Sequence, residues 1–214
     1  MPLNDDLTIL HSKVLASLPA DVANKILEEN KKLFSSLLES KALEKGSPAP
    51  DVFFRDKDIK PVYLKDLLKD HHIVLSFFRG TWCPYCNMEL TALNEINDQI
   101  KQRDARLISI SPELYQYSEK TVKDKNFPVY TDLANKAADK FGLVFDLPAA
   151  YREIYKMLNI NLNILNGDKD WTLPMPATFI ISKDNIITET FIKADYTKRM
   201  EPDDIIRQLD LLSE

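Results

Sequence analysis

An apolar strand pattern that runs directly into the only two cysteines constrains this chain more than any other feature. Residues 73–78 are apolar apart from one serine, which is typical of a strand buried at the centre of a sheet. Cys83 and Cys86 follow, and a helical pattern then occupies residues 84–102. The cysteines are therefore expected where a strand passes into a helix, beside free N–H groups and the positive end of the helix dipole.

The spacing of the two cysteines favours a redox role over a structural one. A structural disulfide ties distant segments together and a structural zinc site needs four ligands, whereas a lone C-x-x-C closes a very small ring. The spacing does suit a dithiol that cycles to a disulfide. Because a helix N-terminus lowers a thiol pKa, Cys83 is expected to be the more reactive sulfur, with Cys86 one turn later to resolve a mixed disulfide. Arg79 is the nearest cation and is expected to assist either thiolate.

Composition argues against several other classes of protein. The net charge of −5 does not suit a nucleic-acid partner, which would require a basic patch. No stretch approaches about 18 consecutive apolar residues, so no membrane span is expected. The four isolated glycines provide no phosphate loop, and the adjacent His71 and His72 point to opposite faces of a strand, so we expect neither cofactor nor metal. Acidic residues near the N-terminus, where a signal peptide would be basic, favour a cytoplasmic location.

The chain divides into a helical extension over residues 1–45 and a redox domain over 46–214. Two helices are expected in the extension, one over 7–18 and one that Asp21 caps and that continues through Leu38. Their apolar stripe predicts that they cover an apolar surface, either on their own sheet or across a homodimer. Alternating strands and helices then predict an α/β fold, a central mixed sheet with helices on both faces.

The expected elements of the redox domain follow from local pattern. They are strands at 52–54, 62–64, 107–110 and 128–130, a hairpin from 177–182 and 186–193, helices at 113–125, 133–141 and 147–158, a last helix from Pro202, and an irregular excursion over 159–173.

Two segments resemble the thioredoxin superfamily. Trp82-Cys83-Pro84-Tyr85-Cys86 is similar to its active site, and the Pro-Tyr centre matches glutaredoxins. Pro174-Met175-Pro176-Ala177-Thr178 resembles the segment in which that superfamily places a cis-proline opposite the dithiol, with Pro176 at the matching position. The resemblance implies a thioredoxin-like fold in which Trp82, Tyr85 and Met175 contact the substrate.

Further segments resemble one branch, the peroxiredoxin-like proteins of the AhpC/TSA group. Residues 46–52 are similar to that group's N-terminal motif, and 127–132 with 137–142 to its Phe-Pro, Asp and Tyr/Phe-Gly signature. Cys86-Asn87-Met88-Glu89-Leu90 matches the Cys-x-x-Glu-Leu that follows the peroxide-attacking cysteine. The likeness covers about residues 46–195.

Departures from both patterns leave the order of attack open. By the peroxiredoxin alignment Cys86 takes the peroxidatic place, and Cys83 stands where those enzymes carry a hydroxyl. The arginine that holds their thiolate and peroxide would fall at Pro176, so Arg79 or Arg199 would have to reach in from another loop.

A second departure concerns the proton acceptor. Phe77 replaces the buried acid of thioredoxins, six residues before the first cysteine, and Glu89 is our candidate acceptor for the resolving step. The polar connection over 194–202 can border the site, and Arg199 is expected to contact the substrate.

Three functions remain open. The first is a peroxiredoxin-like enzyme that reduces a peroxide through a Cys83/Cys86 cycle and is restored by a thioredoxin- or glutathione-type donor. The second is a disulfide reductase in which Cys83 attacks a substrate disulfide. The third is a redox-regulated binding module, which would show no turnover with any donor.

Overall fold

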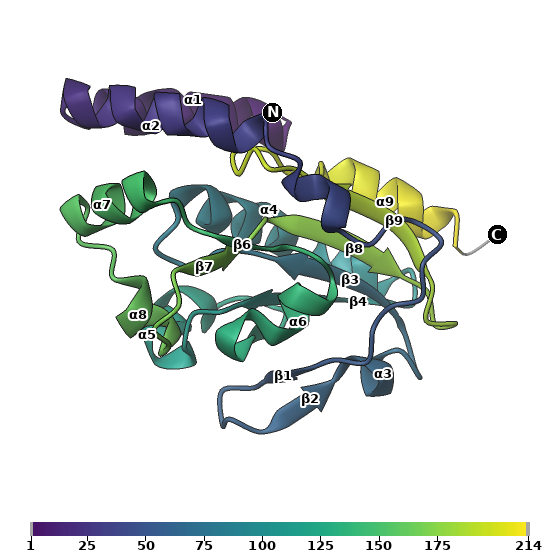
Figure 1. The fold of residues 1–214 in the computed structure, drawn as a ribbon. Helices are drawn as coiled ribbons and strands as arrows, with labels where there is room; N and C mark the ends of the chain where they lie inside the picture. Colours follow the sequence, from purple (N-terminus) through teal and green to yellow (C-terminus); the bar gives the residue numbers. More distant parts are fainter. Residues whose placement is uncertain (1, 213–214) are drawn as a thin grey trace.

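The computed structural model describes residues 2–212, which form one central seven-stranded sheet with helices on both faces, as predicted (Figure 1). The strand order is β2-β1-β5-β4-β3-β8-β9. The strands of this sheet are β1 (Phe53–Arg55), β2 (Pro61–Tyr63), β3 (His72–Phe77), β4 (Ala105–Ser111), β5 (Val129–Thr131), β8 (Ala177–Ile181) and β9 (Ile187–Ile192).

The helices lie in sequence between these strands or outside them. They are α1 (Leu3–Ala16), α2 (Ala20–Phe34), α3 (Leu64–Leu67), α4 (Pro84–Lys101), α5 (Tyr115–Val122), α6 (Lys136–Lys140), α7 (Ala149–Met157), α8 (Leu162–Asn166) and α9 (Pro202–Asp210), with short 3-10 turns η1 (Leu38–Lys41) and η2 (Leu133–Asn135). Helices α4 and α9 pack together on one face of the sheet, and α6 lies on the other (Figure 1).

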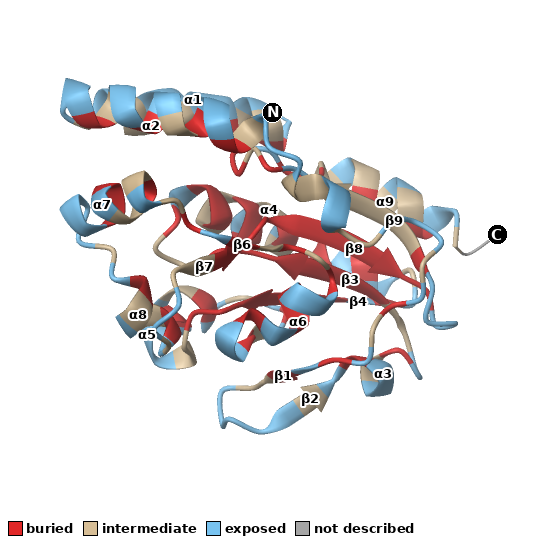
Figure 2. Cartoon of the chain, viewed as in Figure 1, coloured by how far each residue is buried: buried red, intermediate tan, exposed pale blue. Residues whose placement is uncertain are grey.

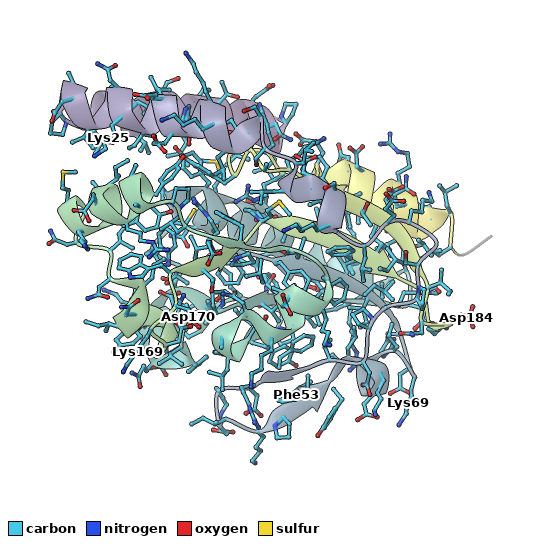
Figure 3. All side chains as sticks on the ribbon, viewed as in Figure 1. Lys25, Phe53, Lys69, Lys169, Asp170 and Asp184 are labelled. Carbon is cyan, nitrogen blue, oxygen red and sulfur yellow. The ribbon has the colours of Figure 1, made fainter. Side chains whose placement is uncertain are left out.

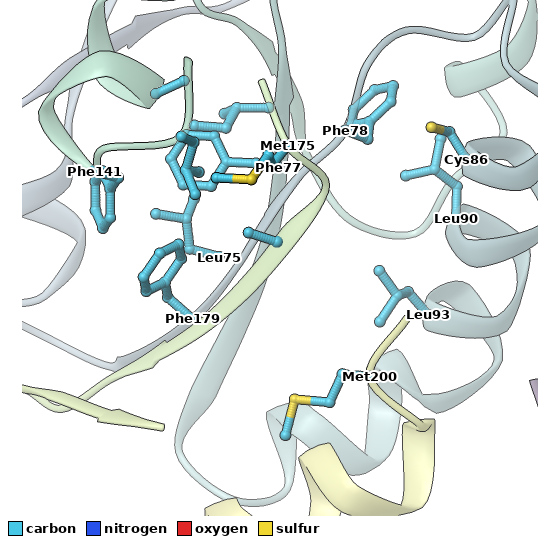
Figure 4. Packing of buried hydrophobic residues seen from close by; sticks show 14 of the residues in the cluster. Leu75, Phe77, Phe78, Cys86, Leu90, Leu93, Phe141, Met175, Phe179 and Met200 are labelled. Atoms are coloured by element: carbon cyan, nitrogen blue, oxygen red, sulfur yellow. The ribbon is translucent and has the colours of Figure 1, made fainter. Parts of the chain in front are cut away.

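Strand β3 is the centre of the core. It pairs in parallel with β4 and antiparallel with β8, so that Phe77 faces Ile110 on one side and Ala177 on the other. The strand is buried over most of its length (Figure 2). The rings of Phe77, Phe141 and Phe179 pack with centroids 4.8–5.9 Å apart, and Figure 4 shows this cluster beside Met175. This packing fixes the end of β3, from which the cysteine loop departs.

The N-terminal helices cover their own chain. Helix α1 packs against α4, and α2 packs against α7. The expected start and end of the second helix were wrong. Pro19, not Asp21, is its N-cap, and the helix ends at Phe34, where Ser36 bonds back to the carbonyl of Leu33. Leu37 therefore leaves the apolar stripe and is 82% exposed. The division of the chain at residues 45 and 46 stays a prediction.

The expectation of an irregular excursion over 159–173 was also wrong. The side chain of Asn161 caps α8, and Gly167, with φ +71°, ends it in the left-handed conformation. Strand β7 (Thr172–Pro174) then pairs antiparallel with β6 (Val144–Asp146), which lies before α7 in the chain, in a separate two-stranded ribbon. A partner so distant leaves no local pattern in the sequence.

None of the helices within residues 2–212 is long and apolar enough to cross a bilayer.

Candidate active site

Both cysteines lie at the start of α4, as predicted from the strand-to-helix transition. Cys83 is the N-cap, with extended backbone angles, and Pro84 is the first helical residue. The N–H of Cys83 donates to the carbonyl of Gly80 at 3.2 Å, and the carbonyl of Cys83 accepts from Asn87 N–H at 3.1 Å. Pro84 lacks the N–H that would have no partner in this position, so the sequence favours a helix start here.

Glu113 anchors the loop that presents the cysteines. Its Oε2 accepts the backbone N–H of Thr81 at 2.7 Å and the Thr81 hydroxyl at 2.8 Å. Asn87 donates to the carbonyl of Thr81 at 2.8 Å. Glu113 was not predicted from the sequence, although a signal existed. It follows β4, and the carboxyl ends of the parallel strands β3 and β4 meet at one edge of the sheet.

Arg79 holds the sulfur of Cys83. Its Nη2 donates to Cys83 Sγ at 3.0 Å and its Nη1 to the hydroxyl of Tyr155 at 3.1 Å. The guanidinium lies 4.1 Å from the ring centroid of Tyr196 and 5.2 Å from that of Trp82. Arg79 is only 5% exposed, so its charge acts on the sulfur with little screening by water.

Arg199 holds the sulfur of Cys86 from a different loop. Its Nη2 lies 3.5 Å from Cys86 Sγ, and its Nε donates to the carboxylate of Glu89. Its Nη1 donates to the carbonyls of Tyr196 at 2.5 Å and Lys198 at 2.7 Å. Arg199 and Glu89 form an ion pair that is almost completely buried. The guanidinium of Arg199 thus contacts both Cys86 and the carboxylate of Glu89, the residue expected to accept a proton.

The two thiols have opposite pKa shifts. Burial acts to raise the pKa of Cys83, but the hydrogen bond from Cys86 and the charges of Arg79 and Arg199 together hold it well below its usual value. Burial, followed by the hydrogen bond to Cys83 and the negative charge there, raises the pKa of Cys86 well above its usual value. The arrangement therefore favours a thiolate on Cys83 and a protonated thiol on Cys86.

Both cysteines are completely buried, with 0% exposure. Side chains project into the space between the N-terminal helices and the elements next to them (Figure 3). Trp82 and Tyr85, which flank the motif, both line a cavity of about 240 Å³ under α1 and α2. The hydroxyl of Tyr85 lies 2.8 Å from Nδ1 of His11 on α1.

Met175 and Pro176 do not line this cavity. Both are buried just before β8, whose first residue, Ala177, pairs with Phe77. Every peptide bond between described residues is trans, including the one before Pro176. Figure 4 draws Met175 beside Phe77, whereas Cys86 lies with Phe78 and Leu90.

Two further residues of the site were not predicted from the sequence. The hydroxyl oxygen of Tyr155, on α7, accepts a hydrogen bond from Arg79. Asn4, on α1, accepts the backbone N–H of Arg199 at 3.1 Å and donates to the Arg199 carbonyl at 2.8 Å. Both are contacts between segments far apart in sequence, and only the helical spacing of α7 hinted that Tyr155 faces inward. Residues 2–212 contain no cluster of three or more His, Cys, Asp or Glu that would suit a metal ion.

Comparison with known proteins relates the chain to one family. The model of the AhpC/TSA family matches residues 45–190. The thiol-disulfide oxidoreductase ResA of Bacillus thuringiensis subsp. konkukian is 28% identical over 156 residues, which cover 73% of each chain. ResA of Geobacillus kaustophilus is 27% identical over 167 residues, 76% of this chain and 80% of the relative.

Solved structures of peroxiredoxins share the fold. Peroxidoxin BcpB from Mycobacterium tuberculosis superposes with a TM-score of 0.62 at 18% identity, covering 80% of this chain and 99% of that one. A peroxiredoxin-like protein from Aquifex aeolicus gives a TM-score of 0.61 at 19% identity, covering 80% of this chain and 88% of that one. The predicted thioredoxin-like architecture is confirmed.

Proposed function

Because the chain belongs to the AhpC/TSA family and is a thiol-dependent oxidoreductase, we propose that it reduces a peroxide through a cycle of the Cys83/Cys86 dithiol. Cys83 is the attacking residue in this proposal, and Cys86 resolves. The expected order from the peroxiredoxin alignment, with Cys86 first, is thereby set aside, since the pKa of Cys83 is the one held low.

The cycle balances in three steps. The Cys83 thiolate attacks one peroxide oxygen, the O–O bond breaks, and Cys83 becomes a sulfenic acid while the departing alkoxide or hydroxide takes a proton. The thiol of Cys86 then displaces water from the sulfenic acid and forms the disulfide. Two thiols of a donor reduce this disulfide and are themselves oxidised to a disulfide.

The observation that carries this proposal is the pairing of each buried sulfur with its own arginine. Arg79 lies on Cys83 and Arg199 on Cys86, and the peroxiredoxin resemblance requires such a guanidinium at a position that is Pro176 in this chain. A buried guanidinium stabilises both the thiolate and the charge that develops on the leaving oxygen. Small peroxides suit sulfurs that are completely buried.

Disulfide reduction is the second candidate. The relatives named thiol-disulfide oxidoreductase and the low pKa of Cys83 favour it. Burial of both sulfurs in the reduced protein disfavours attack on a protein disulfide as the first step, because that disulfide must align its own sulfurs with the attacking one.

The proposal extends to the surroundings of the enzyme. A thioredoxin- or glutathione-type donor and a cytoplasmic, reducing compartment suit a dithiol that must be re-reduced after each turnover. A homodimer is included because Leu27 and Leu37 leave apolar surface at the N-terminal helices, 40% and 82% exposed. Light scattering after size exclusion measures the mass, and a monomer at micromolar concentration would remove the dimer from the proposal.

Single-turnover oxidation of the reduced protein tests the function. Wild type, Cys83→Ser and Cys86→Ser are mixed with hydrogen peroxide, and the sulfenic acid is followed by mass spectrometry. We expect Cys86→Ser to accumulate a sulfenic acid on Cys83, and Cys83→Ser to react at least about tenfold more slowly. Oxidation that is lost only in Cys86→Ser would reverse the order of attack.

Slow oxidation of all three proteins would instead reject peroxide reduction. In that case, a mixed disulfide trapped on Cys83 from a model substrate would identify a disulfide reductase. The absence of turnover with any donor would leave the redox-regulated binding module.

A further inference from the structure

The two arginines of the site differ in their counter-ions. Both guanidinium groups are buried, with 5% exposure for Arg79 and 1% for Arg199. Arg199 forms an ion pair with Glu89, a partner that disulfide formation does not remove. Arg79 forms no ion pair with an Asp or Glu among residues 2–212, and its Nη2 lies 3.0 Å from the sulfur of Cys83. In the reduced protein, the Cys83 thiolate is therefore the counter-ion of Arg79.

Disulfide formation removes this counter-ion. The Cys83 thiolate and the Cys86 thiol give two electrons to an oxidant and release one proton, and the S–S bond that forms is uncharged. Arg79 then keeps neutral partners, the hydroxyl of Tyr155 and two aromatic rings, which compensate only in part for the lost charge. Because a buried cation without a counter-ion is costly, the oxidised protein is stabilised if water reaches Arg79.

One part of the N-terminal extension covers Arg79. Arg79 lines the cavity of about 240 Å³ under α1 and α2. The residues of these two helices and their connection that line the cavity all lie between positions 11 and 26, and we call this stretch the tip segment. They are His11, Val14, Leu15, Leu18 and Ile26. Displacement of the tip segment would therefore open the cavity to solvent on the side of Arg79.

Few buried side chains hold the tip segment in place. Val22 and Ile26 are the buried residues within it, whereas the buried residues of α1, Leu3 and Leu7, both lie before it. One side-chain hydrogen bond joins the tip segment to the redox domain, between His11 and the hydroxyl of Tyr85. Segments with few buried contacts open at a low free energy, so a modest change at Arg79 can shift this equilibrium.

We propose that the tip segment is a redox-dependent lid, closed over Arg79 while Cys83 is a thiolate and open when Cys83 and Cys86 form a disulfide. Opening hydrates Arg79 and uncovers Trp82 and Tyr85, which border the cysteines in the sequence. A thiol donor then meets these residues in the oxidised protein, whereas the reduced protein keeps them covered. The inference rests on the disulfide of the proposed cycle and not on which oxidant forms it.

Hydrogen–deuterium exchange of the full chain, followed by mass spectrometry, tests the lid. The wild type is compared in the reduced state and after oxidation with diamide, which accepts the two electrons and becomes a hydrazine. Amides of the tip segment should exchange at least about tenfold faster in the oxidised protein, while those of β4 should stay within about twofold. Equal exchange of the tip segment in the two states overturns the proposal.

A matched pair of variants separates the loss of charge from the geometry of the disulfide. Cys83→Ser removes the thiolate without forming a disulfide, so its tip segment should exchange fast even under reducing conditions. Cys86→Ser keeps the Cys83 thiolate and should be as protected as the reduced wild type. Fast exchange in both variants, or in neither, overturns the assignment of the Cys83 charge as the group that closes the lid.

The outcomes for the lid and for peroxide reduction can be told apart. If peroxide does not oxidise the wild type but diamide speeds exchange in the tip segment, the proposed peroxide reduction has failed and the lid stands. If peroxide forms the disulfide and exchange in the tip segment does not change, the lid has failed and the proposed function stands.

Discussion

At the scale of single residues, contacts in the site could be predicted from the sequence only where the two partners are close together in the chain. Arg79 stands four residues before Cys83, so its contact with that sulfur could be predicted from proximity. Arg199 was named only because it belongs to a polar loop expected to border the site, since 113 positions separate it from Cys86. Tyr155 was not predicted at all, because its bond to Arg79 depends on how α7 packs.

Removal of the Arg79 charge should raise the pKa of Cys83. In Arg79→Met the sulfur keeps its burial but loses its nearest cation, so the thiolate absorbance near 240 nm should titrate roughly 1–3 pH units higher than in wild type. A thiol with a depressed pKa is ionised at neutral pH, whereas one with a raised pKa is not. Oxidation by peroxide at pH 7 should therefore slow, and the difference from wild type should vanish at alkaline pH.

Arg55→Met, on β1, is the control and should titrate like wild type. A titration of Arg79→Met that overlays the wild type would mean that the hydrogen bond from Cys86, the charge of Arg199 and the helix N-terminus hold the thiolate without Arg79.

The buried pair of Glu89 and Arg199 should be costly to break from one side. Glu89→Gln leaves the Arg199 charge without its counter-ion, and we expect about 3–5 kcal/mol lower stability in urea unfolding. Glu89→Gln combined with Arg199→Met should lose less than the sum of the two single variants, since no unpaired charge remains.

Glu153→Gln removes one partner of an exposed pair with Lys156 and should change stability by less than about 0.5 kcal/mol. A similarly small loss in Glu89→Gln would contradict the tight coupling of the buried pair.

At the scale of elements, local periodicity predicted most helices and strands but not how they are joined. The strand over 73–78 and the helix from Pro84 were correctly predicted because burial and capping leave marks within a few residues. The ribbon of β6 and β7 was missed because each strand has three residues and a distant partner. The contact between α1 and the loop that contains Arg199 was likewise not predicted.

Asn4 should hold the loop that contains Arg199 in position. Its amide bonds to both the N–H and the carbonyl of Arg199, and Glu201 accepts two backbone N–H groups at the start of α1. Asn4→Ala should therefore cost about 1–3 kcal/mol and speed hydrogen exchange at residues 196–201. Thr8→Ala, which removes only a hydroxyl bonded within α1, is the control. Equal exchange in the two variants would show that Asn4 does not hold the loop.

At the scale of the whole molecule, the fold was predictable and the enclosure of the dithiol was not. Alternating strands and helices indicated a mixed sheet with helices on both faces, which the strand order confirms. The sequence also indicated that the N-terminal helices cover an apolar surface. It did not indicate that this surface includes the residues flanking Cys83, because a helical stripe does not identify its partner.

Because the dithiol is enclosed, its reaction rate should depend on the size of the reagent. In the native reduced protein, the bulky disulfide reagent DTNB should react with the thiols on the order of a hundredfold more slowly than in denaturant, because both sulfurs have 0% exposure. Hydrogen peroxide should oxidise the same native protein without denaturant. Rapid release of two equivalents of the coloured thiolate from native protein would refute the enclosure.

The contacts of Asn4 with Glu201 and with Arg199 also bear on the order in which the protein is synthesised. A ribosome completes α4 long before it adds residue 199, so the nascent chain presents Cys83 and Cys86 without Arg199, and α1 without the carboxylate that caps it. The environment of Cys86 is complete only when both ends of the chain have met. Before release, the pair is therefore an unprotected dithiol, exposed to oxidants that the finished enzyme would exclude.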